Sequence, residues 1–356
     1  MTDNLVLHLD GQRYEGWKAI TIVNSLQQVA DSFTLSLSDA WLAPRKLAAP
    51  QVGMPATISL DNDVIASGYL EDVDLSYGDG VHEISATGYS KAYDLLVCSN
   101  TLTSKNYNNV TLLELARQLC QPFGISVSAD TDVGKPFNCT LDPGQPIMDL
   151  LVEYARYRGV VLTSTSSGDL LITKAGTQRT QTPLKLGVNI MRAAPRFSAR
   201  DVYTEYHVVG QDAGANWDAA DEKNPASSKT AYYDKQRLYG RYKPLVITCD
   251  SPVSESDCIA RSKAEAASRW ARARQVIYTV GGWRQYHDGP VWPVNHLVRV
   301  DDYYAGIKED QLIVERRLIL DNRGQRTELL IMPPAAYDPI PLPDPDASGG
   351  LVWAQQ

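Results

Sequence analysis

The sequence predicts a mainly β protein with an α/β insert, organised as two similar β-barrels, a small two-helix α/β module and one long helix. Three features lead to this expectation. Both ends of the chain carry short runs of alternating apolar and polar residues separated by turn residues, which is typical of antiparallel strands. The middle carries two helical patterns of similar form, each followed by a short extended run. A further helical pattern, around Ala264, leads directly into another extended run.

Residues 1–100 are expected to form the first barrel. The dipeptide Asp10-Gly11 lies between two extended runs and favours a type I′ hairpin, because both residues accept the positive φ angles of this turn. Further turns are expected at 61–63 and 78–80. Many short strands joined by short turns are typical of a small barrel or sandwich, and we expect a barrel.

Residues 101–180 are expected to form the α/β module, which contains a tandem helix–strand repeat. Thr111 and Glu114 have the spacing of a capping box at the start of the first helix. A proline opens the second helix, at a position where the first helical turn tolerates it. Each helix is followed by a glycine, Gly124 or Gly159, and then by a short extended run.

Residues 181–335 are expected to form the second barrel, interrupted by a loop and a helix. The loop, 212–229, consists largely of small and charged residues and is predicted to be a mobile surface loop. The helix, 254–274, has acidic residues near its start and arginines near its end, as the helix dipole favours. The remaining residues, 336–356, alternate prolines with acidic residues and are expected to be an extended, poorly ordered tail.

Small side chains form a stripe along one face of the long helix. Ala260, Ala264, Ala267 and Ala271 lie on this face, with Trp270 beside it. Such a stripe lets another backbone approach closely, and the partner could be the chain's own second barrel or a neighbouring subunit. The high helix propensity of alanine is a third explanation.

Two tryptophans, Trp283 and Trp292, lie in the segment between the two extended runs that follow the helix. Both lie next to glycine or proline residues, which indicates a loop. We expect these side chains to anchor the loop by burial against the barrel.

No pattern of residues indicates an enzyme, a cofactor or a metal site. The five histidines are scattered, and no motif for a catalytic triad, a zinc protease or a phosphate-binding loop is present. Adjacent carboxylates such as Asp301 and Asp302 lie in an extended run, so they should point to opposite faces and be solvated. The net charge of −8 argues against a protein that binds nucleic acid by neutralising phosphates. We see no secretory signal or membrane-spanning run.

Two groups of short motifs extend over nearly the whole chain. The first group follows the small-residue helix: Gly282-Trp283, Gly289-Pro290-Val291-Trp292-Pro293 and Asp301-Asp302. The second group lies in the N-terminal run: Asp31 to Asp39, Val52-Gly53, Ser67-Gly68-Tyr69 and Gly88-Tyr89-Ser90. Together, and in this order, these motifs resemble the late control protein D family, the tail hub proteins of contractile-tailed phages.

The resemblance implies a structural baseplate protein of a virion that is synthesised in the host cytoplasm. It implies a homotrimer whose subunits each supply two similar barrels to a ring of near six-fold shape. Such a ring would join the tail tube to the central membrane-piercing spike and would let DNA pass without specific binding. The partners would be the spike protein, the tail tube and other baseplate proteins, with no direct membrane insertion by this chain.

Related hubs are fused to their spike, whereas this chain ends soon after its second barrel. A separate spike protein is therefore expected, and the tail 336–356 or the loop 212–229 could help to bind it. The acidic composition would suit a channel that DNA crosses without sticking.

Two other functions remain open at this stage. A tail-associated peptidoglycan hydrolase would need carboxylates that converge in a cleft. A host-surface carbohydrate-binding tail protein would need exposed aromatic side chains, for which Trp217, Trp283 and Trp292 are the candidates.

Overall fold

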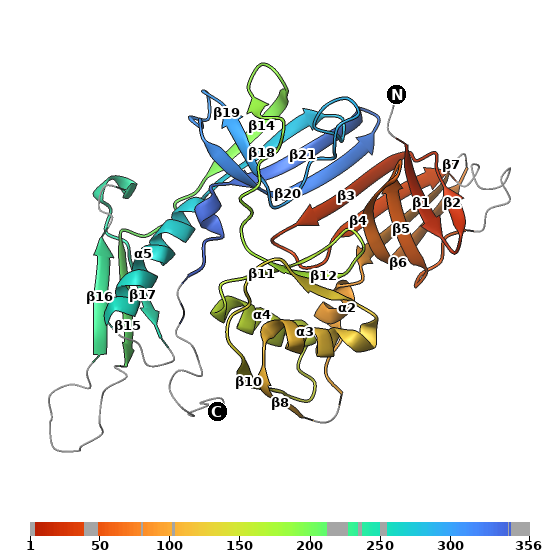
Figure 1. The fold of residues 1–356 in the computed structure, drawn as a ribbon. Coiled ribbons are helices and arrows are strands. Elements are labelled where there is room, and N and C mark those ends of the chain that lie inside the picture. The colour runs from red at the N-terminus through yellow and green to blue at the C-terminus, as the bar shows by residue number, and fades with distance from the viewer. Residues whose placement is uncertain are drawn as a thin grey trace, which may run out of the picture.

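The computed structural model describes residues 4–38, 49–79, 81–101, 104–211, 227–233, 237–249, 255–340 and 342. Strands dominate, as expected. Figure 1 shows the N-terminal strands on the right, the C-terminal strands beside them at the upper centre, and the α/β module below. The longest helix lies at the left against a small separate sheet (Figure 1).

Most strands belong to one 13-stranded sheet that runs through both halves of the chain. The first half contributes β1 (Leu5–Leu9), β2 (Gln12–Tyr14), β3 (Ala19–Ser25), β4 (Ser32–Ser38), β5 (Pro55–Leu60), β6 (Asp63–Gly78) and β7 (Val81–Ser90). The second half contributes β13 (Leu184–Lys185), β14 (Ile190–Phe197), β18 (Arg274–Gly281), β19 (Leu297–Asp301), β20 (Asp310–Asp321) and β21 (Gly324–Met332). The order is β14-β18-β21-β20-β3-β4-β7-β6-β5-β1-β2, with β13 paired to β19 and β19 to β20.

Local turn chemistry forms the hairpins of the first half. Asp10 and Gly11 join β1 to β2 with φ angles of 46° and 74°, which confirms the predicted turn. Asp61, with φ of 53°, lies in the turn between β5 and β6. Alternate residues of these strands, such as Leu5 and Leu7, are buried in the core of the first half.

The two halves are joined by strand pairing between β3 and β20. This antiparallel ladder runs from Ser25 opposite Glu315 to Ile20 opposite Leu320. The sequence predicted two separate barrels, whereas the described strands of both halves form one continuous ladder. Hairpin signals are local in sequence, so they could not indicate a pairing between strands almost 300 residues apart.

The α/β module lies between the two halves in sequence. It consists of α2 (Tyr93–Val97), β8 (Lys105–Val110), α3 (Leu112–Cys120), the 3-10 turn η2 (Gln121–Phe123), β9 (Val127–Ala129), β10 (Phe137–Leu141), α4 (Ile147–Tyr157), β11 (Val161–Ser164) and β12 (Leu170–Thr173). The capping box of α3 is present: Glu114 N donates to Thr111 Oγ1 at 3.3 Å, and Thr111 N donates to Glu114 Oε2 at 2.9 Å. Gly124 and Gly159 both have positive φ, as the repeat predicted.

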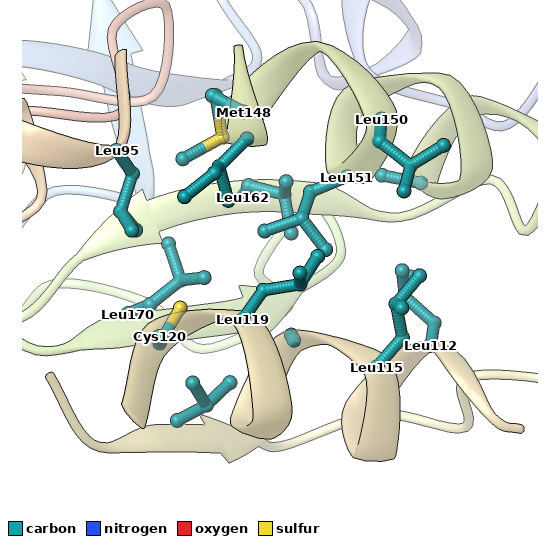
Figure 2. Close-up of a cluster of buried hydrophobic side chains, with 14 of the residues drawn as sticks. Leu95, Leu112, Leu115, Leu119, Cys120, Met148, Leu150, Leu151, Leu162 and Leu170 are labelled. Atoms are coloured by element: carbon teal, nitrogen blue, oxygen red, sulfur yellow. The ribbon is translucent and has the colours of Figure 1, made fainter. Parts of the chain in front are cut away.

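The apolar faces of α3 and α4 share one core, which Figure 2 shows with Leu115 and Leu119 on one helix and Leu150 and Leu151 on the other. Strands β8 and β10 were not predicted. Most residues of β8 are polar and exposed, so its sequence carries no strand period.

The long helix α5 (Glu255–Arg272) packs against a three-stranded sheet of β15 (Glu205–Gln211), β16 (Ser227–Tyr233) and β17 (Pro244–Thr248), with the 3-10 turn η3 (Arg237–Gly240) between β16 and β17. Residues 212–226 of the predicted loop lie outside the described residues, and its last residues, 227–229, begin β16.

The start of the predicted tail is folded, which corrects the expectation of an extended tail from residue 336. The 3-10 turn η4 (Pro334–Ala336) packs against α5, and Ala336 is fully buried. The carbonyl of Ala336 accepts hydrogen bonds from Arg272 Nε at 3.0 Å and Ser268 Oγ at 3.4 Å. The amino-acid composition of the tail does not indicate this ordered turn, because the turn is held by packing against α5, which is distant in sequence. Residues 341 and 343–356 lie outside the described part.

The close approach of β6 and β7 at Gly68 gives a test of the fold. A Cβ atom at Gly68 would lie 1.7 Å from the carbonyl oxygen of Tyr89, a backbone atom of the neighbouring strand. We expect Gly68→Ala to lower the free energy of unfolding by about 3 kcal/mol, measured by chemical denaturation. Gly78→Ala in the same strand is the matched control, because nothing lies within 4 Å of its Cβ position, and it should change stability by less than about 0.5 kcal/mol. Equal effects of the two variants would contradict the register of β6 and β7.

Candidate assembly site

The hairpin formed by residues 283–292, called the tryptophan hairpin below, connects the hydrophobic cores of the two halves. Trp283 and Trp292 lie on opposite arms of this hairpin, where Trp292 N donates to the Trp283 carbonyl at 3.4 Å. Trp283 is fully buried in the core of the first half, and its indole N–H donates to the Ile319 carbonyl at 3.1 Å. Trp292 is buried in the core of the second half. The loop therefore places one aromatic side chain in each core.

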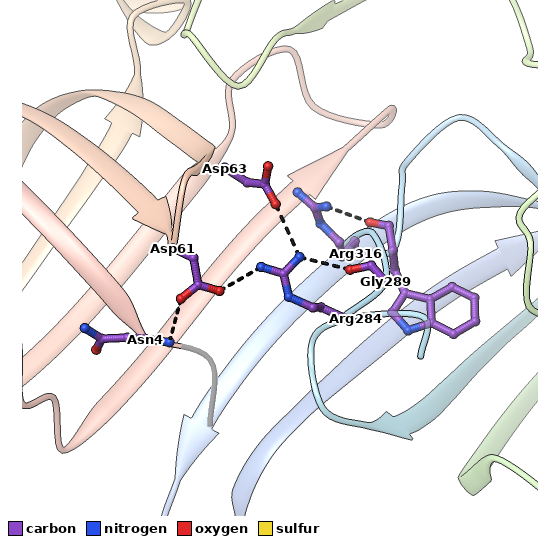
Figure 3. A network of polar contacts seen from close by, with 7 residues as sticks. Asn4, Asp61, Asp63, Arg284, Gly289 and Arg316 are labelled. Carbon is purple, nitrogen blue, oxygen red and sulfur yellow. Dashed lines mark hydrogen bonds and ion pairs between the residues drawn. The ribbon is translucent and has the colours of Figure 1, made fainter. Parts of the chain in front are cut away.

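Arg284, next to Trp283, ties this hairpin to the turn between β5 and β6. Figure 3 shows its guanidinium between two carboxylates of the first half. Arg284 Nη2 donates to Asp61 Oδ2 at 2.9 Å, and Nη1 donates to Asp63 Oδ2 at 3.3 Å and to the Gly289 carbonyl at 3.0 Å. The Asp61 and Asp63 side chains are half exposed or more, so this cluster fixes orientation more than it adds stability.

A buried polar network crosses the β3–β20 junction. Asn24 Nδ2 donates to Asp31 Oδ2 at 2.7 Å, and Arg316 Nε donates to Asn24 Oδ1 at 3.1 Å. Arg316 Nη1 also donates to the Trp292 carbonyl at 2.6 Å (Figure 3). Asn24 and Asp31 belong to the first half and Arg316 to the second, so the network joins both halves to the tryptophan hairpin.

Asp31 also contacts the module. Its backbone N–H lies 3.1 Å from Ser90 Oγ on β7 and 3.3 Å from Ser164 Oγ on β11. Asp31 therefore lies where the first half, the module and the second half meet.

Burial shifts the ionisation of this network. Loss of solvent raises the pKa of Asp31 to about 6, although the hydrogen bond from Asn24 and the positive charge of Arg316 oppose the shift. Burial also lowers the pKa of Arg316 to about 10, against the attraction of Asp31. Each charged group thus depends on the other for its solvation.

Besides its terminal strand β2, which pairs with β1, the large sheet leaves one side of β14 and of the later part of β6 uncovered among the described residues. Apart from one bridge between Ile190 and Leu186, strand β14 pairs only with β18. Strand β6 pairs with β5 as far as Tyr69, and Leu70 still forms backbone hydrogen bonds with Met54 and Gly53. From Asp72 onward, the pairing of β6 is with β7. Uncovered edges of this kind present backbone donors and acceptors to other chains.

The two edges carry complementary side chains. On the face of the sheet opposite its core, β14 presents Arg192 and Arg196, while β6 presents Asp72 and Asp74. On the core face, the exposed apolar side chains are Phe197 at the end of β14, with Met191 at the bulge near its start, and Leu75 and Tyr77 on β6. One edge is thus basic and apolar and the other acidic and apolar.

The alanine stripe of α5 is divided. Ala271 is buried, Ala264 is partly buried, and Ala260 and Ala267 are exposed. The side of α5 that packs on the small sheet instead carries Cys258, Ser262 and Ala266. Trp270 is partly exposed and stacks with the Arg274 guanidinium at 5.3 Å.

Side chains that could bind a metal ion or a carbohydrate do not gather at one place in the described part of the chain. No group of three or more His, Cys, Asp or Glu side chains that could hold a metal is found among these residues. Trp283 and Trp292 are buried, and Trp217 lies outside the described residues. None of the helices in the described part is long and apolar enough to cross a membrane.

The expectation that Asp302 is solvated is wrong. Asp302 is buried and accepts hydrogen bonds from the Tyr278 hydroxyl at 2.8 Å and from the backbone N–H groups of Tyr304 and Ala305. Burial and this carboxylate raise the pKa of Tyr278. Asp302 stabilises the turn that follows it, because its carboxylate accepts hydrogen bonds from the backbone N–H groups of Tyr304 and Ala305 in place of backbone carbonyls.

Comparison with domain families places this architecture in the baseplate of a phage tail. Residues 4–90 match the N-terminal domain of Mu phage baseplate assembly protein GpP-like proteins. Residues 92–174 match the second domain of gp44-like baseplate hub proteins, and residues 254–340 match the fourth domain of Mu phage baseplate assembly protein GpP. The chain belongs to the family of Mu-type phage tail baseplate hub proteins.

Individual relatives agree over most of their length. The chain is 29% identical to baseplate hub protein gp44 of Escherichia phage Mu, over 94% of this chain and 88% of that protein. The crystal structure of the 43 kDa tail protein of prophage MuSo2 from Shewanella oneidensis has 30% identity and a TM-score of 0.83, and covers 94% of this chain and 99% of its own. A tail protein from Neisseria meningitidis MC58 shares the fold, with a TM-score of 0.77 at 19% identity and coverage of 96% and 100%. The family places the protein in the virion tail.

Several residues of this site carry little local sequence signal. Asn24 is followed by Ser25 and Arg316 lies between Glu315 and Arg317, so nothing in the local sequence distinguishes them, and only their pairing across the halves explains them. The edge of β6 had a visible signal, because Asp72 and Asp74 alternate with Val73 and Leu75. That alternation predicts a strand but does not show that one side of it stays uncovered.

The raised pKa of Asp31 predicts a dependence of stability on pH. The folded protein holds a proton on Asp31 up to about pH 6, whereas an unfolded chain releases it near pH 4, so the stability contributed by this group falls as the pH rises between these values. Asp31→Asn has no such titration. We expect the difference in free energy of unfolding between wild type and this variant to decrease by about 1–3 kcal/mol from pH 4 to pH 7. Parallel pH curves would show that Asp31 is not the titrating group.

Removal of Arg316 tests the charge pair itself. Arg316→Met leaves Asp31 buried without its cation and should lower the free energy of unfolding by about 3 kcal/mol at pH 7. In the background of Asp31→Asn the same substitution should cost less, because no buried negative charge is left unpaired. A double-mutant cycle by urea denaturation measures this coupling, and strictly additive losses would argue against it.

Proposed function

We propose that three copies of this chain form a ring of near six-fold shape in a contractile tail. The ring joins the tail tube to the central membrane-piercing spike and lets DNA pass during genome ejection. The observation that carries this proposal is the complementarity of the two uncovered edges of the large sheet. Family membership supports it, and the resemblance to late control protein D hubs supplies the trimer and the spike as expectations.

The strand order sets how neighbouring copies would meet. Every neighbour pair from β14 to β6 along the sheet is antiparallel, and the number of steps is odd, so β14 and β6 run in opposite directions. A rotation about an axis along the strands preserves strand direction. The β14 edge of one copy then lies antiparallel to the β6 edge of the next, and repetition of this contact closes a ring.

In this arrangement the charges and the apolar residues match. With Asp72 opposite Arg196, Asp74 lies diagonally between Arg192 and Arg196, on the face away from the core. Cross-strand pairs of opposite charge contribute roughly 0.2–1 kcal/mol each. Pro195 lies on β14 and would leave one backbone position of this edge without a donor, which restricts the partners that can pair there.

Each half of the sheet would supply one of two similar segments of the ring wall, which would account for a six-fold shape from three chains. The face opposite the core includes Thr21, Thr34 and Thr87 in the first half, a surface of small polar side chains. Asp72 and Asp74 lie on the same face as Arg192 and Arg196, so their opposite charges would largely offset each other and such a wall would bind DNA phosphates only weakly.

Other surfaces are candidates for additional contacts. The exposed residues of the alanine stripe, Ala260 and Ala267, could be covered by a neighbouring subunit, since Ile259 beside them is also partly exposed. Residues 343–356 and the loop 212–226 are candidates for contact with a separate spike protein. Truncation after Asp338 with unchanged spike binding would remove the tail from this proposal.

The oligomeric state is the direct test of the function. We expect native mass spectrometry to give a mass of three chains and negative-stain images to show a ring. A protein that stays monomeric at high concentration, with its spike and tube partners present, would contradict the proposal.

Charge reversal tests the contact between the edges. Asp72→Arg with Asp74→Arg should weaken trimer formation by about tenfold or more in sedimentation experiments, because like charges then face each other. Combination with Arg192→Asp and Arg196→Asp in the same chain should restore it. Glu153→Arg, on an exposed position of α4, is the matched control and should have no effect.

A further inference from the structure

The small sheet of β15, β16 and β17 and the helix α5, together called the lateral lobe below, leave and rejoin the large sheet at one place. Phe197, the last residue of β14, pairs with Arg274, the first residue of β18. Next to this pair, Ser198 N donates to the Ala273 carbonyl at 2.9 Å. Figure 1 shows the lateral lobe at the left, with the C-terminal end of α5 beside the large sheet. The two chain passages run side by side, which is the geometry of a hinge.

The segment that follows β21 holds the lateral lobe against the rest of the chain. Outside the lobe, α5 makes its most extensive contact among the described elements with η4. The carbonyl of the fully buried Ala336 accepts hydrogen bonds from Arg272 Nε at 3.0 Å and from Ser268 Oγ at 3.4 Å, both on α5. Ala336 and Ala271 of α5 also share a hydrophobic cluster with residues of the first half, β20 and β21: Leu26, Leu312, Val314 and Met332.

The same segment reaches the first half and the α/β module. The Tyr337 hydroxyl is hydrogen-bonded to the Gln27 side chain, which lies between β3 and β4, and burial raises the pKa of this phenol to about 12. Pro339 lies against Gly159, just after α4, where an added Cβ would be 2.6 Å from Pro339 Cβ. Residues 334–339, called the latch below, therefore contact the lateral lobe, the first half and the module.

Two properties suit the latch to opening and closing. Among the described residues it pairs with no strand, and segments held by few backbone hydrogen bonds open more readily than sheets. Pro334 and Pro339 restrict the conformations of the open segment, so closure loses less conformational entropy. The ladder between β20 and β21 is long by comparison, and it should stay intact when the latch opens.

We propose that the lateral lobe pivots at the hinge beside Phe197 and Arg274, and that the latch holds it in the position seen in the structure. When the latch leaves α5, the lobe loses its most extensive contact with the rest of the chain and can change direction. The strand pairing of the large sheet does not change. The subunit can thus redirect the lobe while its sheet keeps one geometry. This device belongs to the single chain, so it stands or falls independently of the proposed ring.

Hydrogen exchange tests the latch. Ala336→Arg places a long charged side chain at a fully buried position and should expel the latch from α5. The amide of Tyr337, which donates to the Pro334 carbonyl at 3.0 Å, should then exchange at least about tenfold faster, while the amides of β20 and β21 keep their protection. Asp338→Arg, at an exposed position two residues later, is the matched control and should leave exchange unchanged. Unchanged exchange in Ala336→Arg would contradict the latch.

A distance measurement tests the pivot. Spin labels at Val246→Cys on β17 and Val64→Cys on β6 report the position of the lateral lobe relative to the large sheet, with Cys98→Ser as background and labelled chains diluted into unlabelled protein. The otherwise unchanged protein and Asp338→Arg should give one narrow distance distribution, whereas Ala336→Arg should broaden it and shift its mean. If the Tyr337 amide exchanges faster while the distribution stays narrow and unshifted, the lobe is fixed without the latch and the proposal is wrong.

Discussion

The antiparallel pairing of β3 with β20 is the constraint on which the rest of the structure depends. It converts two sets of hairpins, which local turns could form independently, into one sheet with a single core face. The tryptophan hairpin follows from this pairing, because Trp283 reaches the core of the first half only when that half lies beside β20. The network of Asn24, Asp31 and Arg316 is also formed only at this junction. Separation of the halves would therefore expose apolar side chains and leave charged groups without partners.

Polar groups at the junction make the arrangement specific. An apolar seam would tolerate small shifts between the halves, whereas a buried carboxylate and guanidinium lose much of their solvation unless their partners lie at defined positions. Asp31 extends this requirement to the module through Ser90 and Ser164. The three regions are consequently held in one geometry. A subunit that serves as a rigid part of a larger particle needs such a fixed geometry more than it needs maximal stability.

The uncovered edges connect the fold to its role in the baseplate. A monomeric protein usually protects its sheet edges, but here β14 and the later part of β6 present apolar residues together with charges of opposite sign. These features are explained together if a second copy covers them. The relatives of this chain are structural baseplate hub proteins, and contact surfaces of this kind agree with such a role.

The sequence by itself determined the local elements: the Asp10-Gly11 hairpin, the capping box at Thr111, the glycines that end the module helices and the extent of α5 to within a few residues. Its motifs also indicated the family. These features depend on neighbours in the chain, so their signals are contained in short segments. Only the tertiary structure decided the pairing of β3 with β20, the burial of Asp302 and Ala336, and which strand edges stay uncovered. Each of these depends on contacts between residues far apart in the sequence, and for such contacts the strand and turn preferences of a single segment contain no information.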